Sequence, residues 1–122
     1  MERIEEFKLE GKDFMYIDLS GLMSNDEFLK LTGIVESLMA KYPEHSLYTI
    51  TNIENIRFGP GSKEMIAKYL ESNKPYVKYG VVIGMDGIKK AIVNVAFKIS
   101  GRDNIHFAFT KDKAIEWLLR QD

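Results

Sequence analysis

The chain has 122 residues, of which 45% are hydrophobic and 29% charged, and its formal net charge at pH 7 is −1. This is the size and composition of one globular domain, so we expect residues 1–122 to share a single core. A near-neutral chain gives no basis for a nucleic-acid or membrane-surface partner, and no apolar run is long enough to span a bilayer. The absence of cysteine excludes disulfides and thiol catalysis, and the acidic, polar N-terminus is unlike a signal peptide. We therefore expect a cytoplasmic protein.

Hydrophobic periodicity and turn residues predict nine elements along the chain. In order, these are strands at 3–9 and 13–19, a helix at 25–42, a strand at 47–51, a helix at 62–72, a strand at 79–84, a helix at 86–100, a strand at 105–109 and a helix after Thr110. The order is β-β-α-β-α-β-α-β-α. Because strands and helices alternate after the first hairpin, we expect an α/β fold with a mostly parallel five-stranded sheet and an antiparallel first hairpin.

Local signals support the helix starts and ends. Ser24 and Glu27 have the spacing of a capping box, and Asp86 and Thr110 stand where later helices begin. Gly101 follows the 86–100 helix, as a left-handed C-terminal cap would. Gly33 lies inside the first helix, where it costs up to ~1 kcal/mol relative to alanine, so we expect a close contact between that helix and the sheet there.

The segment from residue 47 to residue 70 is the first candidate for a functional site. A strand leads through a loop rich in Asn, Gly and Pro to a helix that opens at Ser62. Unpaired N–H groups and the positive end of the helix dipole receive anions at such a position, so Ser62 is a candidate phosphorylation or anion site. Glu54, Arg57 and Gly61 flank it. The alternative is that Ser62 only caps the helix and that the loop charges are solvated.

The 86–100 helix is apolar on two sides. A helical wheel gathers one face, sufficient to pack on the sheet, from Ile88, Ala91, Ile92, Val95 and Ile99. Val93 and Phe97 fall on the opposite side, beside Lys89 and Lys90. These four residues are our candidate partner surface, because a second apolar side on an amphipathic helix is typical of a binding face. The alternative is that a neighbouring helix covers Val93 and Phe97.

No catalytic or metal-binding set is evident. His45 and His106 have no metal-ligand spacing to other candidate ligands, and the glycines at 59–61 and 84–87 match neither a P-loop nor a dinucleotide fingerprint. No nucleophile can be paired with a base. We expect no enzymatic activity, no metal and no cofactor.

Several local patterns occur together with this order of elements. They are Tyr16-Ile17-Asp18, the segment from Leu47 to Phe58, the segment from Asn73 to Lys78, and Ser100-Gly101-Arg102. In these features the chain resembles the STAS domain, and in particular the small bacterial SpoIIAA-like proteins related to anti-sigma factor antagonists. In phosphorylated members of that family a serine opens the helix after the third strand, within an Asp-Ser-Ser-Gly motif. The second serine of the motif falls on Ser62, although the aspartate and the following glycine are missing here.

The resemblance implies a non-enzymatic regulatory or protein-interaction module. It would dock a partner protein, or a second copy as a homodimer, through the 86–100 helix and the 52–62 loop. The alternative is a carrier of a small ligand, either a lipid or a nucleotide, in a pocket between the last two helices and the sheet. The many Met, Phe and Tyr residues of the chain favour that second hypothesis.

Overall fold

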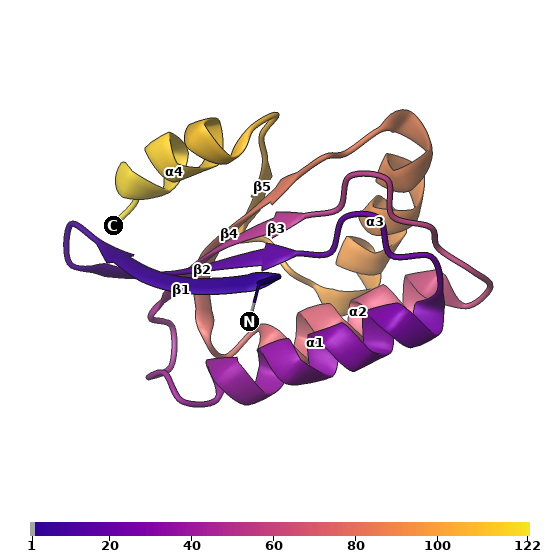
Figure 1. Ribbon diagram of the computed structural model, residues 1–122, viewed down its shortest axis with the longest axis horizontal. Coiled ribbons are helices and arrows are strands. Elements are labelled where there is room, and N and C mark those ends of the chain that lie inside the picture. Colours follow the sequence, from indigo (N-terminus) through magenta and orange to yellow (C-terminus); the bar gives the residue numbers. More distant parts are fainter. Residues whose placement is uncertain (1) are drawn as a thin grey trace.

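The computed structural model describes residues 2–122 as one five-stranded sheet with four helices (Figure 1). The elements are β1 (Ile4–Leu9), β2 (Lys12–Asp18), α1 (Asn25–Met39), β3 (Leu47–Asn52), α2 (Ser62–Asn73), β4 (Val77–Ile83), α3 (Gly87–Ser100), β5 (Ile105–Phe107) and α4 (Lys111–Leu119). The strands lie in the order β1-β2-β3-β4-β5, with β1 antiparallel to β2 and every other pair parallel. The predicted fold class is confirmed.

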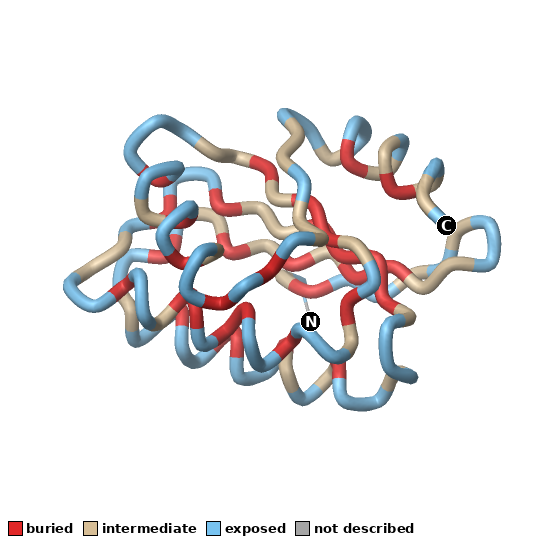
Figure 2. The backbone as a smooth tube through the Cα atoms, turned by 180° about the vertical axis from the view of Figure 1, so that it is seen from behind, coloured by how far each residue is buried: buried red, intermediate tan, exposed pale blue. Residues whose placement is uncertain are grey.

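The helices form two unequal layers on the sheet. The parallel strands follow one another across the sheet in a single direction, and right-handed crossover connections then place all their helices on the same face. Accordingly, α1, α2 and α3 share one face of the sheet. Side chains alternate along β2, so Met15 points to this layer while Phe14 points to the other face, which α4 covers. Figure 2 shows the helices burying one side and exposing the other.

The smaller layer holds the C-terminal end against the first hairpin. Ala114 and Leu118 of α4 are fully buried against the sheet. Trp117 stacks on His106 with ring centroids 4.3 Å apart. The Lys12 Nζ donates to the carbonyl oxygens of Leu119 at 2.9 Å and Gln121 at 2.7 Å, which ties the β1–β2 turn to the end of the chain.

The structure corrects one expectation about α1 and confirms part of another. Gly33 is exposed, and a Cβ placed on it would have no heavy atom within 4 Å, so the predicted close contact with the sheet is wrong. The buried stripe runs along the other side of the helix through Phe28, Leu31 and Val35. The capping box forms, since the Ser24 Oγ accepts from the Glu27 N–H at 3.2 Å, but the Glu27 carboxylate accepts from the N–H of Met23 at 2.7 Å.

Candidate functional site

The links that follow β2, β3 and β4 pack together at one end of the sheet. The Ile53 N–H donates to the Ile83 carbonyl at 3.0 Å, and the Gly21 N–H donates to the Glu54 carbonyl at 2.9 Å. Parallel strands direct their carboxyl ends to the same edge, and ligands of open α/β sheets bind outside these ends. The first turns of α2 and α3 begin at this edge, so it is the candidate site.

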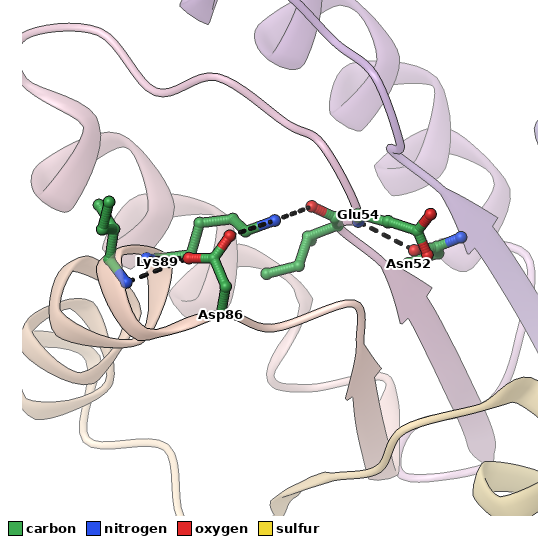
Figure 3. A network of polar contacts seen from close by, with 6 residues as sticks. Asn52, Glu54, Asp86 and Lys89 are labelled. Atoms are coloured by element: carbon green, nitrogen blue, oxygen red, sulfur yellow. Dashed lines mark hydrogen bonds and ion pairs between the residues drawn. The ribbon is translucent and has the colours of Figure 1, made fainter.

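A network of polar contacts joins the end of β3 to the start of α3 (Figure 3). The Asn52 Oδ1 accepts from the Glu54 N–H at 2.9 Å. The Lys89 Nζ lies 3.2 Å from the Asp86 Oδ2 and donates to the Ile53 carbonyl oxygen at 3.1 Å. Because the ammonium of Lys89 is buried between these two oxygens, it fixes the position of α3 relative to the β3–α2 link.

Asp86 caps α3 as the sequence predicts. Its Oδ1 accepts from the N–H groups of Ile88 at 3.1 Å and Lys89 at 3.0 Å. The Lys89 N–H is the largest cause that lowers the pKa of this carboxyl, and the Lys89 ammonium lowers it further. Asp86 is therefore held as a carboxylate at the positive end of the helix.

Gly84 allows the β4–α3 link to pass over the turn at Asn52. Its φ is +84°, and a Cβ there would lie 2.5 Å from the Glu54 nitrogen and 2.9 Å from the Asn52 Oδ1. A side chain would therefore suffer both backbone strain and a clash. This close approach is what brings the two links into one surface.

Ser62 opens α2 as predicted, but its interpretation as a cap is wrong. The N-cap is Gly61 at φ 79°, no side chain caps the helix, and Ser62 is the first helical residue. A left-handed glycine turns the chain into α2, and this places the serine on the inner side of the helix, where it is 6% exposed. Whether Ser62 receives a phosphate or another anion stays a prediction.

The loop residues beside Ser62 point outward. Glu54, Arg57 and Gly61 are exposed. Within residues 2–122, no ion pair joins Glu54 to Arg57. Ser62 does share a shallow depression with Ile92 of α3. The structure therefore brings the two predicted parts of the site, the loop and the 86–100 helix, next to each other.

The predicted partner surface on α3 is assigned to the wrong side. Val93 is 5% exposed, Lys89 is buried, and Phe97 is half-buried and stacks on Phe107 with centroids 5.7 Å apart. Of the four predicted residues, Lys90 alone is exposed. The alternative, that a neighbouring helix covers Val93 and Phe97, is correct, because both line a small space beneath α3 together with α2 side chains.

The exposed side of α3 carries the residues that the wheel assigned to the sheet. Ile88 is 81% exposed, Ile99 is 53% exposed and Val95 is 37% exposed. The buried side of the same helix consists of Lys89, Val93, Ala96 and Ser100. In this orientation Lys89 reaches the Ile53 carbonyl, and the small side chains of Ala96 and Ser100 allow α3 to approach its neighbours closely.

The pocket predicted between the last two helices and the sheet does not form, because α3 and α4 lie on opposite faces. Instead, a cavity of about 60 Å³ lies between the sheet, α2 and α3. A larger cleft of about 550 Å³ lies at the carboxyl edge, and it is lined in part by Met85, Lys90, Phe107 and Phe109.

Arg102 locks the end of α2 to the link before β5. Its Nη1 donates to the Leu70 carbonyl at 2.7 Å and to the Asn73 Oδ1, and its Nε donates to the Asn104 Oδ1 at 2.9 Å. Burial lowers the pKa of its guanidinium, whose charge sits at the negative end of the α2 dipole. The Ser100-Gly101-Arg102 pattern marked this residue, but nothing in the sequence assigned it a contact.

Other classes of site can be checked over the described chain. Within residues 2–122, no group of three or more His, Asp or Glu side chains is placed to hold a metal ion. None of the helices in that range is sufficiently long and apolar to cross a membrane.

Comparison with known proteins identifies the fold. No family model and no curated protein matches the sequence. Among solved structures, however, the chain shares a SpoIIAA-like fold, the fold of STAS domains. It is similar to an uncharacterised protein of the DUF3478 family with a SpoIIAA-like fold from Shewanella loihica, with a TM-score of 0.70, 16% identity, and coverage of 94% of this chain and 91% of that one. It is also similar to an anti-sigma-factor antagonist (STAS) domain protein from Planctomyces limnophilus, with a TM-score of 0.62, 10% identity, and coverage of 95% and 97%. The predicted resemblance is thus confirmed as a likeness of fold.

Proposed function

We propose that residues 1–122 form one non-enzymatic regulatory or interaction module that docks a partner protein through the outer face of α3. The observation that carries the proposal is the orientation of this helix. It turns Ile88, Val95 and Ile99 to solvent while it buries a lysine and a serine. An apolar stripe of this kind on a small domain is typical of a binding face.

The β3–α2 link and Ser62 form the adjoining part of the proposed surface. Ser62 and Ile92 lie in the same depression, so a phosphate on Ser62 would add roughly −1.5 to −2 charges beside α3 and alter what that helix can bind. Because Ser62 is buried, the first turn of α2 must open before a kinase can reach its hydroxyl. Such opening at a helix end is a local event.

Crosslinking in the cells of origin tests the docking proposal. A photo-reactive amino acid would replace Val95 on α3 and, as a matched control, Ile34, an exposed aliphatic residue on α1. We expect a crosslinked protein from position 95 and none from position 34. If position 95 gives no crosslink, or the same products as position 34, the proposal is wrong. A crosslink to the same chain identifies a homodimer.

A small-ligand carrier is the second candidate, and the carboxyl-edge cleft is what favours it. Its volume of about 550 Å³ falls within the range of ligand pockets, whereas the cavity of about 60 Å³ is too small for a lipid or a nucleotide. Phe109 lines the cleft and is almost fully exposed. Native mass spectrometry of the protein from its own cells tests this candidate, since a carrier would retain a bound lipid or nucleotide and an empty chain would count against it.

A further inference from the structure

We infer that β1 pairs with β1 of a second copy of the chain, so that two five-stranded sheets join into one. This surface is separate from the proposed docking face on α3 and does not depend on it. β1 is the edge strand of the sheet, and in the described part of the chain only β2 pairs with it (Figure 1). The main-chain groups along such an open edge are a template for another strand.

The hydrogen-bond pattern of the first hairpin determines which residues of β1 face the open edge. The Asp18 N–H donates to the Arg3 carbonyl at 2.7 Å, so these two residues form a hydrogen-bonded pair. Such pairs alternate with non-hydrogen-bonded pairs along an antiparallel ladder. The N–H and C=O groups of Ile4, Glu6 and Lys8 therefore point away from β2. These residues would supply the hydrogen bonds to a second strand.

Charge selects one register for a symmetric pair of β1 strands. A residue with outward main-chain groups must face another of the same kind, so the two-fold axis passes through a residue and not between two. An axis at Glu5, Glu6 or Lys8 would place like charges directly opposite each other, which is destabilising. An axis at Phe7 instead places Glu6 of each copy opposite Lys8 of the other. In this register the strand is complementary in charge to itself.

A row of aromatic side chains on the α4 face of the sheet ends at the same residue. The row consists of register partners on β1 to β4, namely Phe7, Phe14, Tyr48 and Tyr79. Phe7 stacks on Phe14 with ring centroids 5.2 Å apart, and Phe14 stacks on Tyr48 at 5.7 Å. With the axis at Phe7, the two Phe7 side chains form a non-hydrogen-bonded pair, in which side chains lie closest. The aromatic row would then continue into the second copy.

The contacts of Glu6 and Lys8 within the chain leave room for this pairing. The Lys8 Nζ lies 3.1 Å from the Asp13 Oδ1 on β2, and the Tyr42 hydroxyl donates to the Glu6 Oε1 at 2.6 Å. Both Glu6 and Lys8 are nevertheless exposed. The carboxylate of a second copy would approach Lys8 from the side opposite Asp13. Charges on an edge strand exclude most other strands, and this order of charges favours a copy of itself.

The strength of the association follows from the size of the interface. The paired stretch covers about five residues of each strand, which belongs to the class of small, weak interfaces. We expect a dissociation constant of roughly 10–100 µM. Analytical ultracentrifugation of the full chain between roughly 1 µM and 500 µM would measure it.

Charge reversal tests the predicted pairs. Glu6→Lys and Lys8→Glu should each weaken self-association at least about tenfold, because each places like charges opposite each other. An equimolar mixture of the two variants should associate at least as tightly as the wild type, because lysines of one chain then face glutamates of the other. Glu5→Lys is the matched control, since Glu5 is exposed on the other face of the same strand and would face Leu9. It should leave the association unchanged.

Disulfide formation tests the register. The chain has no cysteine, so each introduced thiol is unique. Phe7→Cys would place two Cα atoms about 4.5 Å apart, within the range of a disulfide, and we expect a covalent dimer under mild oxidation. Two copies of Glu5→Cys would lie about 13 Å apart and should form none. Glu5→Cys should instead couple to Leu9→Cys in an equimolar mixture, which keeps Phe7 in place.

Several results would overturn the inference. The first is a wild-type chain that stays monomeric up to about 500 µM. Another is self-association that neither charge reversal weakens, in variants that circular dichroism shows to be folded. A disulfide from Glu5→Cys alone, with none from Phe7→Cys, would mean a different register. A dimer that Val95→Asp abolishes and Glu6→Lys leaves intact would place the second copy on α3 instead.

Discussion

Substituting valine by alanine at two neighbouring positions of α3 tests which side of the helix is buried. Val93 is 5% exposed and lines the space between α3, α2 and the sheet, whereas Val95 is 37% exposed on the outer side. Each substitution removes the same two side-chain carbons, at positions only two residues apart. The difference in the free energy of unfolding between the two variants therefore reports how deeply each valine is buried.

The expected magnitudes follow from what each side chain loses. Val93→Ala removes about 1.6 kcal/mol of transfer free energy and leaves a cavity, so we expect the free energy of unfolding to fall by about 2–3 kcal/mol. Val95→Ala removes a partly exposed group and gains several tenths of a kcal/mol in helix propensity. Its net cost should be about 0.5 kcal/mol or less.

Equilibrium unfolding in urea, followed by far-UV circular dichroism and by the fluorescence of Trp117, measures both variants. The comparison holds if the slope of the free energy against urea is unchanged. If the two costs are equal, or if Val95→Ala costs more, α3 is rotated as the helical wheel suggested and the exposed stripe does not exist. The proposed docking face would then fail with it.

Three further substitutions test which local contacts stabilise the helices and links around the site. Gly33→Ala should stabilise the chain by about 0.5–1 kcal/mol, since Gly33 is helical, exposed and free of neighbours, and urea unfolding would show a higher midpoint. Gly84→Ala should cost at least about 3 kcal/mol in the same assay, because it adds a clash at the Asn52 turn to the strain of a positive φ. Asp86→Asn should be less stable than the wild type at neutral pH, and the difference should shrink as the pH falls below about 4. The pKa of Asp86 is lowered in the folded state, so its stabilisation is present above the unfolded pKa and is lost only as the pH falls through the lower folded pKa.

Each of these substitutions has a result that would contradict it. A loss of stability in Gly33→Ala would restore the close contact that the sequence suggested. Gly21→Ala is the control for Gly84, because its φ is +70° and a Cβ there meets nothing within 4 Å. Equal costs at Gly21 and Gly84 would mean that the approach of the two links is unimportant. A deficit in Asp86→Asn that persists in acid would show that the charge of Asp86 is not what stabilises α3.

The sequence predicted the elements well because their ends carry local signals. Ser24 and Thr110 cap α1 and α4 through their hydroxyls, Asp86 caps α3, and Gly101 ends it at φ 69°. Each of these contacts joins residues at most four positions apart, so residue type and spacing are enough to find it. The parallel sheet follows from the same order of elements.

The rotation of α3 could not be predicted, because it depends on contacts between distant parts of the chain. Both sides of the helix are apolar, and hydropathy assigns the longer aliphatic residues to the interior. The structure instead buries Lys89, whose ammonium has an acceptor 36 positions away at Ile53. The prediction that Ser62 caps α2 was wrong for a related reason. The left-handed turn at Gly61 makes Gly61 the N-cap, so Ser62 becomes the first residue of the helix and is not its cap.

The consecutive order of the strands has a consequence for local stability. Each strand pairs with its neighbour in sequence, and β5 is joined to the sheet by only three residue pairs. We therefore expect β5 to separate from β4 more readily than β1 to β4 separate from one another, because each of those strand pairs has six residue pairs. A partner that binds α3 only in the closed form would suppress this opening by mass action. Hydrogen exchange at the amides of β5 would then slow on binding, although β5 lies outside the docking face.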